Sequence, residues 1–211
     1  MGGTTIAGFR AAGWTARLSL GIGVAVLALA AGAPQKAAAA DDVTLAGGVL
    51  TITDATGVNN YVRVSKSNDG LLLGVIDTAG LPATPPPGCT GGGGAIDCPF
   101  ALVSRVVVNL GGGKDRFGPY GNGTRLPQAV DGGPGRDEIE GGPSADTLKG
   151  GTGDDVIRGE SGRDLLLGQA GNDRLAGGRD IDKLKCGKGK HDKGVGGPAE
   201  DTISGCEDEQ R

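Results

Sequence analysis

The chain has 211 residues, of which 44 are glycine and 3% are aromatic, and its formal net charge is −4. So few aromatic side chains exclude a large aromatic core. Without residues 1–40 the chain keeps 18 basic residues against 25 acidic ones, a net charge of −7. This acidic balance disfavours nucleic acids and anionic membranes as partners.

Residues 1–40 have the features of a secretory signal peptide. They contain no Asp or Glu, carry Arg10 and Arg17 near the start, and are apolar from residue 18 to about residue 33. The segment ends in four alanines, which form a small-residue cleavage site. We therefore predict cleavage after Ala40, secretion, and no membrane contact after cleavage. A retained anchor is the alternative, but the apolar run is shorter than the ~20 residues that a spanning helix needs.

Residues 41–110 are predicted to form a β-rich N-terminal cap. Short runs rich in β-branched residues, bounded by Gly, Asn or Asp, give strand candidates at 49–52, 61–64, 71–76 and 103–108. A repetitive coil has open ends, and capping elements generally cover them. A separate ligand-binding β domain is the alternative interpretation.

Residues 111–131 are predicted to be a transition with one isolated repeat-like turn. The segment from Gly111 to Phe117 reads GGGKDRF, which is half of a motif that recurs further along the chain. Its acidic residue, Asp115, lies 22 residues before Asp137 and is out of phase with the later repeats by four. Asp115 is nevertheless a candidate metal ligand.

Residues 132–185 contain six consecutive copies of a nine-residue repeat. The copies read GGPGRDEIE, GGPSADTLK, GGTGDDVIR, GESGRDLLL, GQAGNDRLA and GGRDIDKLK. In every copy the first position is Gly, the sixth is Asp and the eighth is Ile or Leu. A flexible linker has no reason to keep an aliphatic residue at every eighth position, so the repeat predicts a stacked coil.

Each repeat combines a turn with a short strand. Glycine accepts the positive φ angles of tight turns and permits close backbone approach. The last three positions form a strand whose middle, aliphatic side chain points into the coil. The aspartate therefore lies at a turn beside carbonyl oxygens, and Ca²⁺ prefers six to eight oxygen ligands at about 2.3–2.6 Å. No His or Cys occurs in the six copies, which argues against zinc or copper.

The repeat resembles the nonapeptide of the RTX (repeats-in-toxin) calcium-binding family, whose fold is a parallel β-roll. The resemblance implies an all-β chain in which two repeats complete one coil, so residues 18 positions apart share an edge. One edge would then carry Asp137, Asp155 and Asp173, and the other Asp146, Asp164 and Asp182. Four sandwiched Ca²⁺ sites would follow, with turn residues as further candidate ligands. The glycines among them are Gly133, Gly135, Gly142, Gly151, Gly153, Gly162 and Gly171.

Four positions depart from the glycine pattern. The second column holds Glu160 and Gln169 in two copies, and the fourth column holds Ser144 and Asp180 in two others. Asp tolerates left-handed backbone better than most residues. We expect weakened turns at Ser144, Glu160 and Gln169, and a smaller loss at Asp180.

Residues 186–211 are predicted to be a C-terminal cap. Glycines stay in phase at Gly187 and Gly189, but His191 stands where the next Asp is due. We interpret this substitution as the end of the ion ladder. His191, between Lys190 and Asp192, is itself interpreted as a surface residue.

The four cysteines lie at positions 89, 98, 186 and 206. Export favours disulfides, and four cysteines allow three pairings. We favour the local pairs Cys89–Cys98 and Cys186–Cys206. A four-cysteine zinc site is the alternative, but neither pair has the close spacing of such sites.

The sequence as a whole favours a secreted, non-catalytic calcium-binding protein whose repeats are disordered without Ca²⁺. It contains neither a Gly-x-Ser-x-Gly elbow nor a His-Glu-x-x-His helix. Two alternatives stay open. One is a calcium-dependent adhesin or matrix spacer, and the other is a small hydrolase in which the roll only assists export or folding.

Overall fold

The computed structural model describes residues 42–54, 57–68, 70, 72–77, 84–92, 94–119 and 124–210. The expected signal peptide lies outside these residues. Within the described ranges, no helix is long and apolar enough to cross a membrane.

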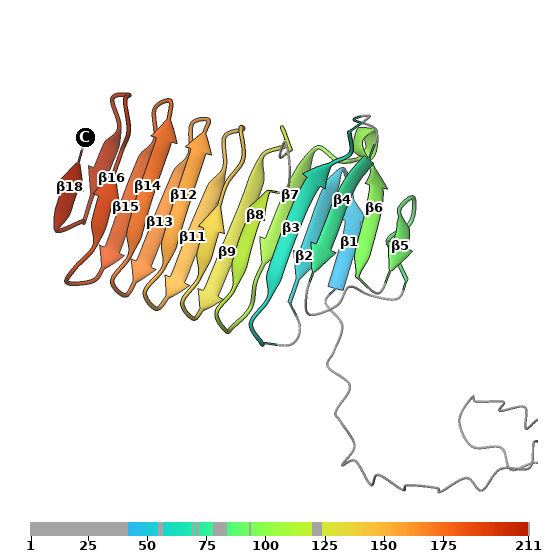
Figure 1. Cartoon of the computed structure of the whole chain (residues 1–211), viewed down its shortest axis with the longest axis horizontal. Helices are drawn as coiled ribbons and strands as arrows, with labels where there is room; N and C mark the ends of the chain where they lie inside the picture. Colours follow the sequence, from blue (N-terminus) through green and yellow to red (C-terminus); the bar gives the residue numbers. More distant parts are fainter. Residues whose placement is uncertain are drawn as a thin grey trace, which may run out of the picture. The chain divides into compact units, whose positions relative to one another are not determined.

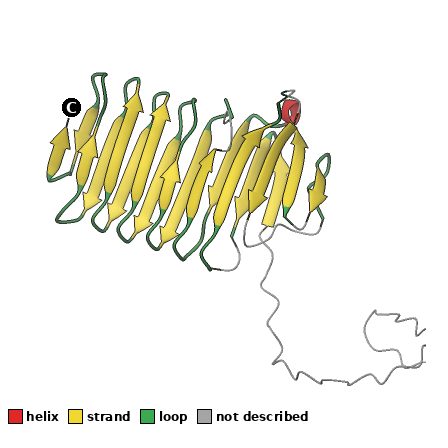
Figure 2. Ribbon diagram, in the orientation of Figure 1, coloured by secondary structure: helices red, strands yellow, loops and turns green. Residues whose placement is uncertain are grey.

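Strands make up nearly all of the regular structure (Figure 2). The single exception among the described residues is a 3-10 turn, η1 (Phe100–Leu102). The strands are β1 (Asp42–Ala46), β2 (Val49–Thr53), β3 (Tyr61–Lys66), β4 (Leu72–Asp77), β5 (Thr90–Gly92), β6 (Ala95–Pro99), β7 (Arg105–Asn109), β8 (Arg116–Pro119), β9 (Gln128–Pro134), β10 (Glu138–Glu140), β11 (Thr147–Thr152), β12 (Val156–Ser161), β13 (Leu165–Ala170), β14 (Arg174–Arg179), β15 (Lys183–Lys188), β16 (Lys193–Val195), β17 (Thr202–Ser204) and β18 (Asp208–Gln210).

The chain winds between two sheets, adding a strand to each in turn (Figure 1). Sheet A has the order β1-β2-β7-β9-β11-β13-β15-β17, and sheet B has the order β18-β16-β14-β12-β10-β8-β3-β4-β6-β5. From β7 onward every pairing is parallel, for example β11 with β13 and β12 with β14. The expected all-β parallel β-roll is confirmed.

The eighth column of the repeat forms the core between the sheets. Its aliphatic side chains are fully or almost fully buried at Ile139, Leu148, Ile157, Leu166, Leu175 and Leu184. Leu148 pairs with Leu166 and Leu166 with Leu184, so equivalent side chains of successive coils stack directly. One repeat alone could not bury its aliphatic residue, and the stack supplies the missing contact.

The N-terminal region continues the roll and does not form a separate domain. Strand β2 pairs in parallel with β7, and β3 in parallel with β8, so β2 and β3 are the first coil. The chain then leaves the coil and adds β4, β6 and β5 to the end of sheet B as antiparallel strands. Strand β1 extends sheet A in the same antiparallel way. The separate-domain alternative is therefore wrong.

Two disulfides join the cysteines in the local pairs that we favoured, Cys89–Cys98 and Cys186–Cys206. The second bond lies inside the last coils. There Gly194 replaces the eighth-column aliphatic residue, and a Cβ at Gly194 would lie only 2.8 Å from Cys206 Sγ. The disulfide thus occupies core space that a leucine fills in the earlier coils.

Candidate metal centre

The aspartates of the sixth column form a ladder along each loop edge of the roll. On one edge, the backbone N–H of Asp137 donates to Asp155 Oδ1 at 2.8 Å, and that of Asp155 donates to Asp173 Oδ1 at 2.9 Å. On the other edge, Asp146 N–H donates to Asp164 Oδ1 and Asp164 N–H to Asp182 Oδ1, both at 2.8 Å. The 18-residue spacing therefore places the six aspartates on two edges as the sequence predicts.

The ladder is buried, but in five of the six repeat aspartates only one carboxylate oxygen accepts a hydrogen bond. The six repeat aspartates are at most 2% exposed. Their Oδ1 atoms accept the backbone bonds, whereas the Oδ2 atoms of Asp137, Asp155, Asp164, Asp173 and Asp182 are buried without a hydrogen-bond partner. Asp146 differs because its Oδ2 accepts the N–H of Gly142 at 2.7 Å. A buried polar atom without a partner is costly, and here the cost recurs coil after coil.

The first-column glycines allow the Oδ2 atoms and the carbonyl oxygens of the next coil to pack directly against their Cα atoms. A Cβ at Gly159 would lie 2.5 Å from both Asp164 Oδ2 and the carbonyl oxygen of Gly177 in the next coil. A Cβ at Gly132 would likewise meet Asp137 Oδ2 and the carbonyl oxygen of Gly150. A carboxylate oxygen and a carbonyl oxygen thus converge where no side chain fits. Such a set of hard oxygen atoms suits a cation such as Ca²⁺.

No basic side chain neutralises the ladder. None of the ion pairs among the described residues includes a ladder aspartate. The same residues also contain no group of three or more His, Cys, Asp or Glu side chains that could hold a metal.

Burial alters the acidity of the ladder. Loss of hydration, together with the charges of Asp146 and Asp182, raises the pKa of Asp164 to about 8, although the bond from Asp146 N–H lowers it. Burial likewise raises the pKa of Asp155 to about 7, and that of Asp173 and Asp182 to about 6. These carboxyl groups need either a proton or a cation to stay buried.

Asp115 belongs to the ladder, so the expectation of an isolated turn was wrong. Its backbone N–H donates to Asp137 Oδ1 at 2.8 Å, and its own Oδ1 accepts the N–H of Asn60 at 2.7 Å. Strand β8 pairs with β10 in the regular register. The register shifts by four residues between β8 and β9, and both strands stack in parallel on the next coil.

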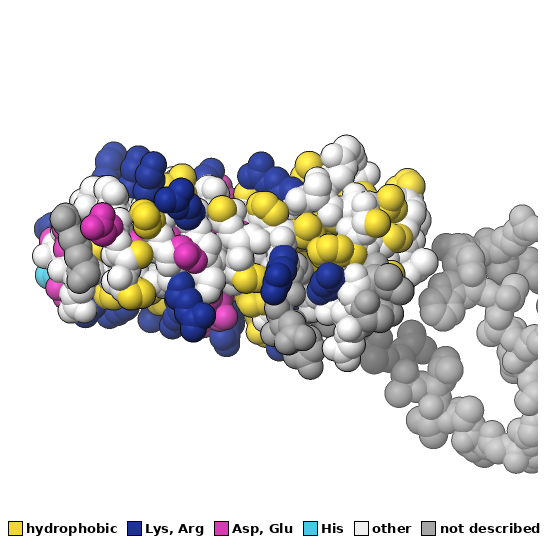
Figure 3. Space-filling view, turned by 90° about the horizontal axis from the view of Figure 1, so that it is seen from above, with side chains coloured by type: hydrophobic (Ala, Val, Ile, Leu, Met, Phe, Trp, Pro, Cys, Tyr) yellow, Lys and Arg dark blue, Asp and Glu magenta, His cyan; other side chains and the backbone are white. Residues whose placement is uncertain are grey.

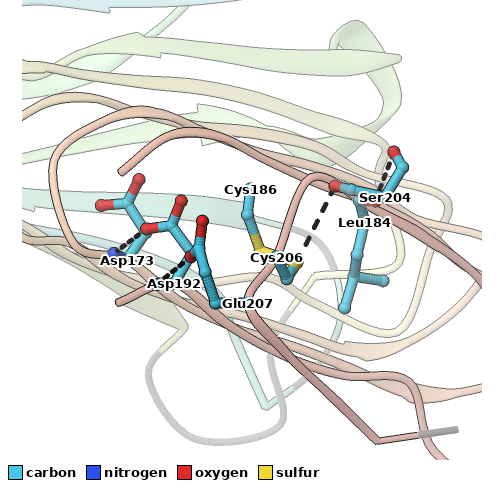
Figure 4. Close-up of a disulfide and its surroundings, with 7 residues drawn as sticks. All are labelled: Asp173, Leu184, Cys186, Asp192, Ser204, Cys206 and Glu207. Carbon is cyan, nitrogen blue, oxygen red and sulfur yellow. Dashed lines mark hydrogen bonds between the residues drawn. A yellow bond between two sulfur atoms is a disulfide. The ribbon is translucent and has the colours of Figure 1, made fainter. Parts of the chain in front are cut away.

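The ladder also continues beyond His191, so the expected break there was wrong as well. Asp173 N–H donates to Asp192 Oδ1 at 2.7 Å, and Asp192 N–H donates to Glu207 Oε2 at 2.7 Å (Figure 4). On the other edge Asp182 N–H donates to Asp201 Oδ1 at 2.8 Å. The Oδ2 atoms of Asp192 and Asp201 are buried and lack a partner, like those of the repeats.

The segment between β15 and β16 is one residue longer than the repeat, which explains why the strict nine-residue phase did not predict Asp192 and Asp201 as ladder residues. It shifts the phase, so that Asp192 takes the ladder position and His191 is exposed beside it. A signal was present in the sequence, because residues 196–204 read GGPAEDTIS and match the repeat once the phase is moved by one. The ladder therefore offers seven neighbouring aspartate pairs in place of four: 115/137, 137/155, 155/173, 173/192, 146/164, 164/182 and 182/201.

The glycines expected at the turns lie where the backbone requires them. Gly133, Gly151, Gly153, Gly162 and Gly171 all have φ between 88° and 134°. Gly135 has a φ of 158°, and Gly142 does not have a positive φ. Of the four residues that replace a glycine of the repeat, Glu160, Gln169 and Asp180 adopt positive φ angles of 76°, 81° and 72°. Ser144 does not have a positive φ. The weakened turn expected at Ser144 therefore has no backbone cause.

Comparison with known proteins agrees with this geometry. The family model of the RTX calcium-binding nonapeptide repeat (4 copies) matches residues 131–166 and residues 149–184. No curated protein and no solved structure shows a significant match to the chain.

Proposed function

We propose that this chain, whose residues 131–184 are RTX calcium-binding nonapeptide repeats, is a secreted, non-catalytic protein that folds its roll around Ca²⁺. The observation that carries the proposal is the row of buried carboxylate oxygens without partners. A cation would satisfy these oxygens and would neutralise the charge that burial disfavours.

The proposed ligands are the ladder aspartates and the carbonyl oxygens of the neighbouring turns. The aspartates are Asp115, Asp137, Asp146, Asp155, Asp164, Asp173, Asp182, Asp192 and Asp201. The first-column carbonyl oxygens beside the Oδ2 atoms, such as that of Gly177, are the proposed further ligands. Bound Ca²⁺ would supply positive charge at each step of the ladder, and the coils on either side would then be held together.

Secretion is supported by the character of residues 1–40 and by the two disulfides, which persist in oxidising compartments. The non-catalytic role is supported by the position of the chain's single histidine, His191, which is exposed in a loop. A protein exported unfolded into millimolar Ca²⁺ would fold outside the cell if its affinity lies near the range of about 10⁻⁶–10⁻³ M.

Far-UV circular dichroism of the purified protein with Ca²⁺ and with a chelator tests the proposal. We expect β structure in Ca²⁺ and a large loss of it at neutral pH in the chelator. The double variant Asp155→Asn/Asp164→Asn should need a much higher Ca²⁺ concentration to fold. Unchanged β content in the chelator would refute the proposal.

A matched control is provided by Asp154, which adjoins Asp155 but is exposed. Its Oδ1 accepts the N–H of Asn172 at 2.9 Å, a bond that asparagine can keep. The variant Asp154→Asn should therefore fold at the same Ca²⁺ concentration as the natural protein. An equal effect of Asp154→Asn and of Asp155→Asn would show that surface charge, and not the ladder, controls folding.

A further inference from the structure

Basic side chains without an ion pair among the described residues lie on both faces of the roll, for example Arg174 and Arg179 on β14 of sheet B, and are most numerous on strand β15 of sheet A. On sheet B, Arg116 and Arg158 pair with Glu138 at 3.2 and 3.0 Å, and Lys193 pairs with Asp208 at 3.5 Å. On sheet A, strand β15 presents Lys183, Lys185 and Lys188, which are exposed and form no ion pair with any acidic residue that the structure describes. We call these three lysines the β15 lysines.

The β15 lysines are aligned with the neighbouring strand. Lys183 pairs with Leu165 and Lys185 with Leu167, and both leucines are half-buried. On the far side of Leu167 lies Lys149, which is already paired with Asp131 at 3.6 Å. The unpaired charge of this face is therefore concentrated on β15, at the end of the roll nearer the C-terminus.

A shallow groove of about 600 Å³ adjoins the β15 lysines. It crosses the ends of β9, β11, β13 and β15, and Lys188 lines one end of it. Four strands at the usual spacing of about 4.8 Å give it a length of about 14 Å. Glycine backbone forms much of its lining, and Thr152 and Gln169 supply polar side chains. Asp131 also lines the groove, from β9 and so away from Lys188, and its carboxylate pairs with Lys149.

Gln169 adopts a costly conformation in this groove. Its φ is 81°, while its register partners on either side are Gly151 and Gly187. A left-handed backbone costs a non-glycine residue of the order of 1–2 kcal/mol, and such strain often accompanies function. The side chain of Gln169 is exposed and lines the groove, so it is available to a ligand.

The acidic net charge of the chain does not oppose an anionic ligand here. Eight ladder aspartates, from Asp115 to Asp192, are buried. These aspartates lie inside the loop edges of the roll, whereas the β15 lysines are exposed on the outer face of sheet A. Figure 3 shows Lys and Arg side chains along both long sides of the roll, with few acidic side chains among them.

We propose that the β15 lysines and the groove beside them bind a linear acidic polysaccharide. This inference rests on the proposed function, because Ca²⁺ both orders the face and neutralises the ladder. The lysine ammonium groups suit the carboxylates of such a polymer, and Thr152 and Gln169 offer hydrogen bonds to its hydroxyl groups. A membrane surface suits the face less well, since its two leucines are half-buried between lysines and no aromatic residue lines the groove.

Binding of hyaluronate to the purified protein in Ca²⁺ tests the proposal, with circular dichroism of the same sample to report folding. We expect binding that weakens steeply with salt, and little binding of the neutral polymer dextran. Phosphatidylglycerol vesicles and duplex DNA are compared under the same conditions. Stronger binding of either, or equal binding of dextran, would overturn the polysaccharide assignment.

Two variants and a control change exposed side chains, so that their effect on hyaluronate binding can be separated from an effect on folding. Lys185→Gln/Lys188→Gln should weaken hyaluronate binding about tenfold, which corresponds to about 1.4 kcal/mol. Gln169→Gly should weaken binding while raising thermal stability, because it relieves the strained φ. Arg174→Gln/Lys193→Gln removes two charges from neighbouring strands of sheet B and should change affinity by less than about twofold.

The failure of this inference and the failure of the proposed function give different results. A folded protein that does not bind hyaluronate, or whose binding is unaffected by the β15 variants, would overturn the polysaccharide proposal alone. A protein that is folded without Ca²⁺ would contradict calcium-dependent folding. Its hyaluronate binding would still be measured, because the face is present in any folded form.

Discussion

Each ladder aspartate carries two oxygens with different roles. Oδ1 accepts a backbone N–H from the preceding coil, for example from Asp137 to Asp155, and so contributes to the fold itself. Except at Asp146, Oδ2 is buried without a protein partner and is therefore the atom left for a cation. An asparagine could still accept the backbone N–H, but it would bring no negative charge to bind the cation.

The turn glycines are required because neighbouring coils approach too closely for a side chain. At Gly153 the φ is 122°, and a Cβ would collide with the carbonyl oxygen of Gly135 in the preceding coil. We predict that Gly153→Ala lowers the free energy of unfolding in Ca²⁺ by about 3 kcal/mol or more, from strain and overpacking together. Denaturant unfolding measures the loss.

Gly94 is the matched control for this substitution. It has no positive φ, and a Cβ there would meet no atom within 4 Å. Gly94→Ala should change stability by no more than about 0.5 kcal/mol. Equal effects at Gly94 and Gly153 would contradict the close-packed arrangement of the coils.

At the scale of the element, the coil tolerates insertions in its loops. Successive ladder residues are 22 residues apart at Asp115 and Asp137, 18 apart within the repeats, and 19 apart at Asp173 and Asp192. The additional residues lie between strands, so the strands keep their register. The ladder is consequently longer than the strict nine-residue repeat.

The Cys186–Cys206 disulfide holds the last coils, where the aliphatic column is interrupted by Gly194. Replacing both cysteines by alanine should cost about 3 kcal/mol of stability from loop entropy. Hydrogen exchange should show the loss of protection in β16, β17 and β18, with little change in β9 to β13. Uniform loss over the whole roll, or none, would contradict this local role.

Much of the fold could be predicted because each position of the repeat has a single structural role. The fixed glycine, aspartate and aliphatic columns specified the roll, its two edges and its core, and the strand candidates near residues 49 and 61 became β2 and β3. The sequence could not show that these strands are the first coil, because 55 residues separate β3 from its partner β8. The shifted phases at Asp115 and Asp192 were misread because strict periodicity hides insertions in loops.

For the whole molecule, the raised pKa values of the ladder predict an unusual pH dependence. The pKa of Asp155 is about 7 and that of Asp164 about 8 in the folded roll, against 3.8 in an unfolded chain. The folded state therefore binds more protons between about pH 4 and pH 8, and its stability falls as the pH rises through this range. In a chelator, the protein should lose β structure between pH 5 and pH 8.

Calcium should reverse this dependence, because the ion replaces the proton on the buried carboxylates. Circular dichroism at pH 5 and pH 8, with and without Ca²⁺, measures both effects. A chelated protein that is more stable at pH 8 than at pH 5 would contradict the assignment of these pKa shifts to burial.

The central claim is that the buried aspartate ladder holds Ca²⁺, and calorimetric titration tests it most directly. Titration of the purified protein with Ca²⁺ at pH 5, where the calcium-free roll is folded with a protonated ladder, in two buffers of different ionisation enthalpy, gives the number of bound ions and the protons released. Seven neighbouring pairs predict more than four ions per chain, with net release of protons on binding. A titration without binding heat in either buffer, or one with no release of protons, would contradict the claim.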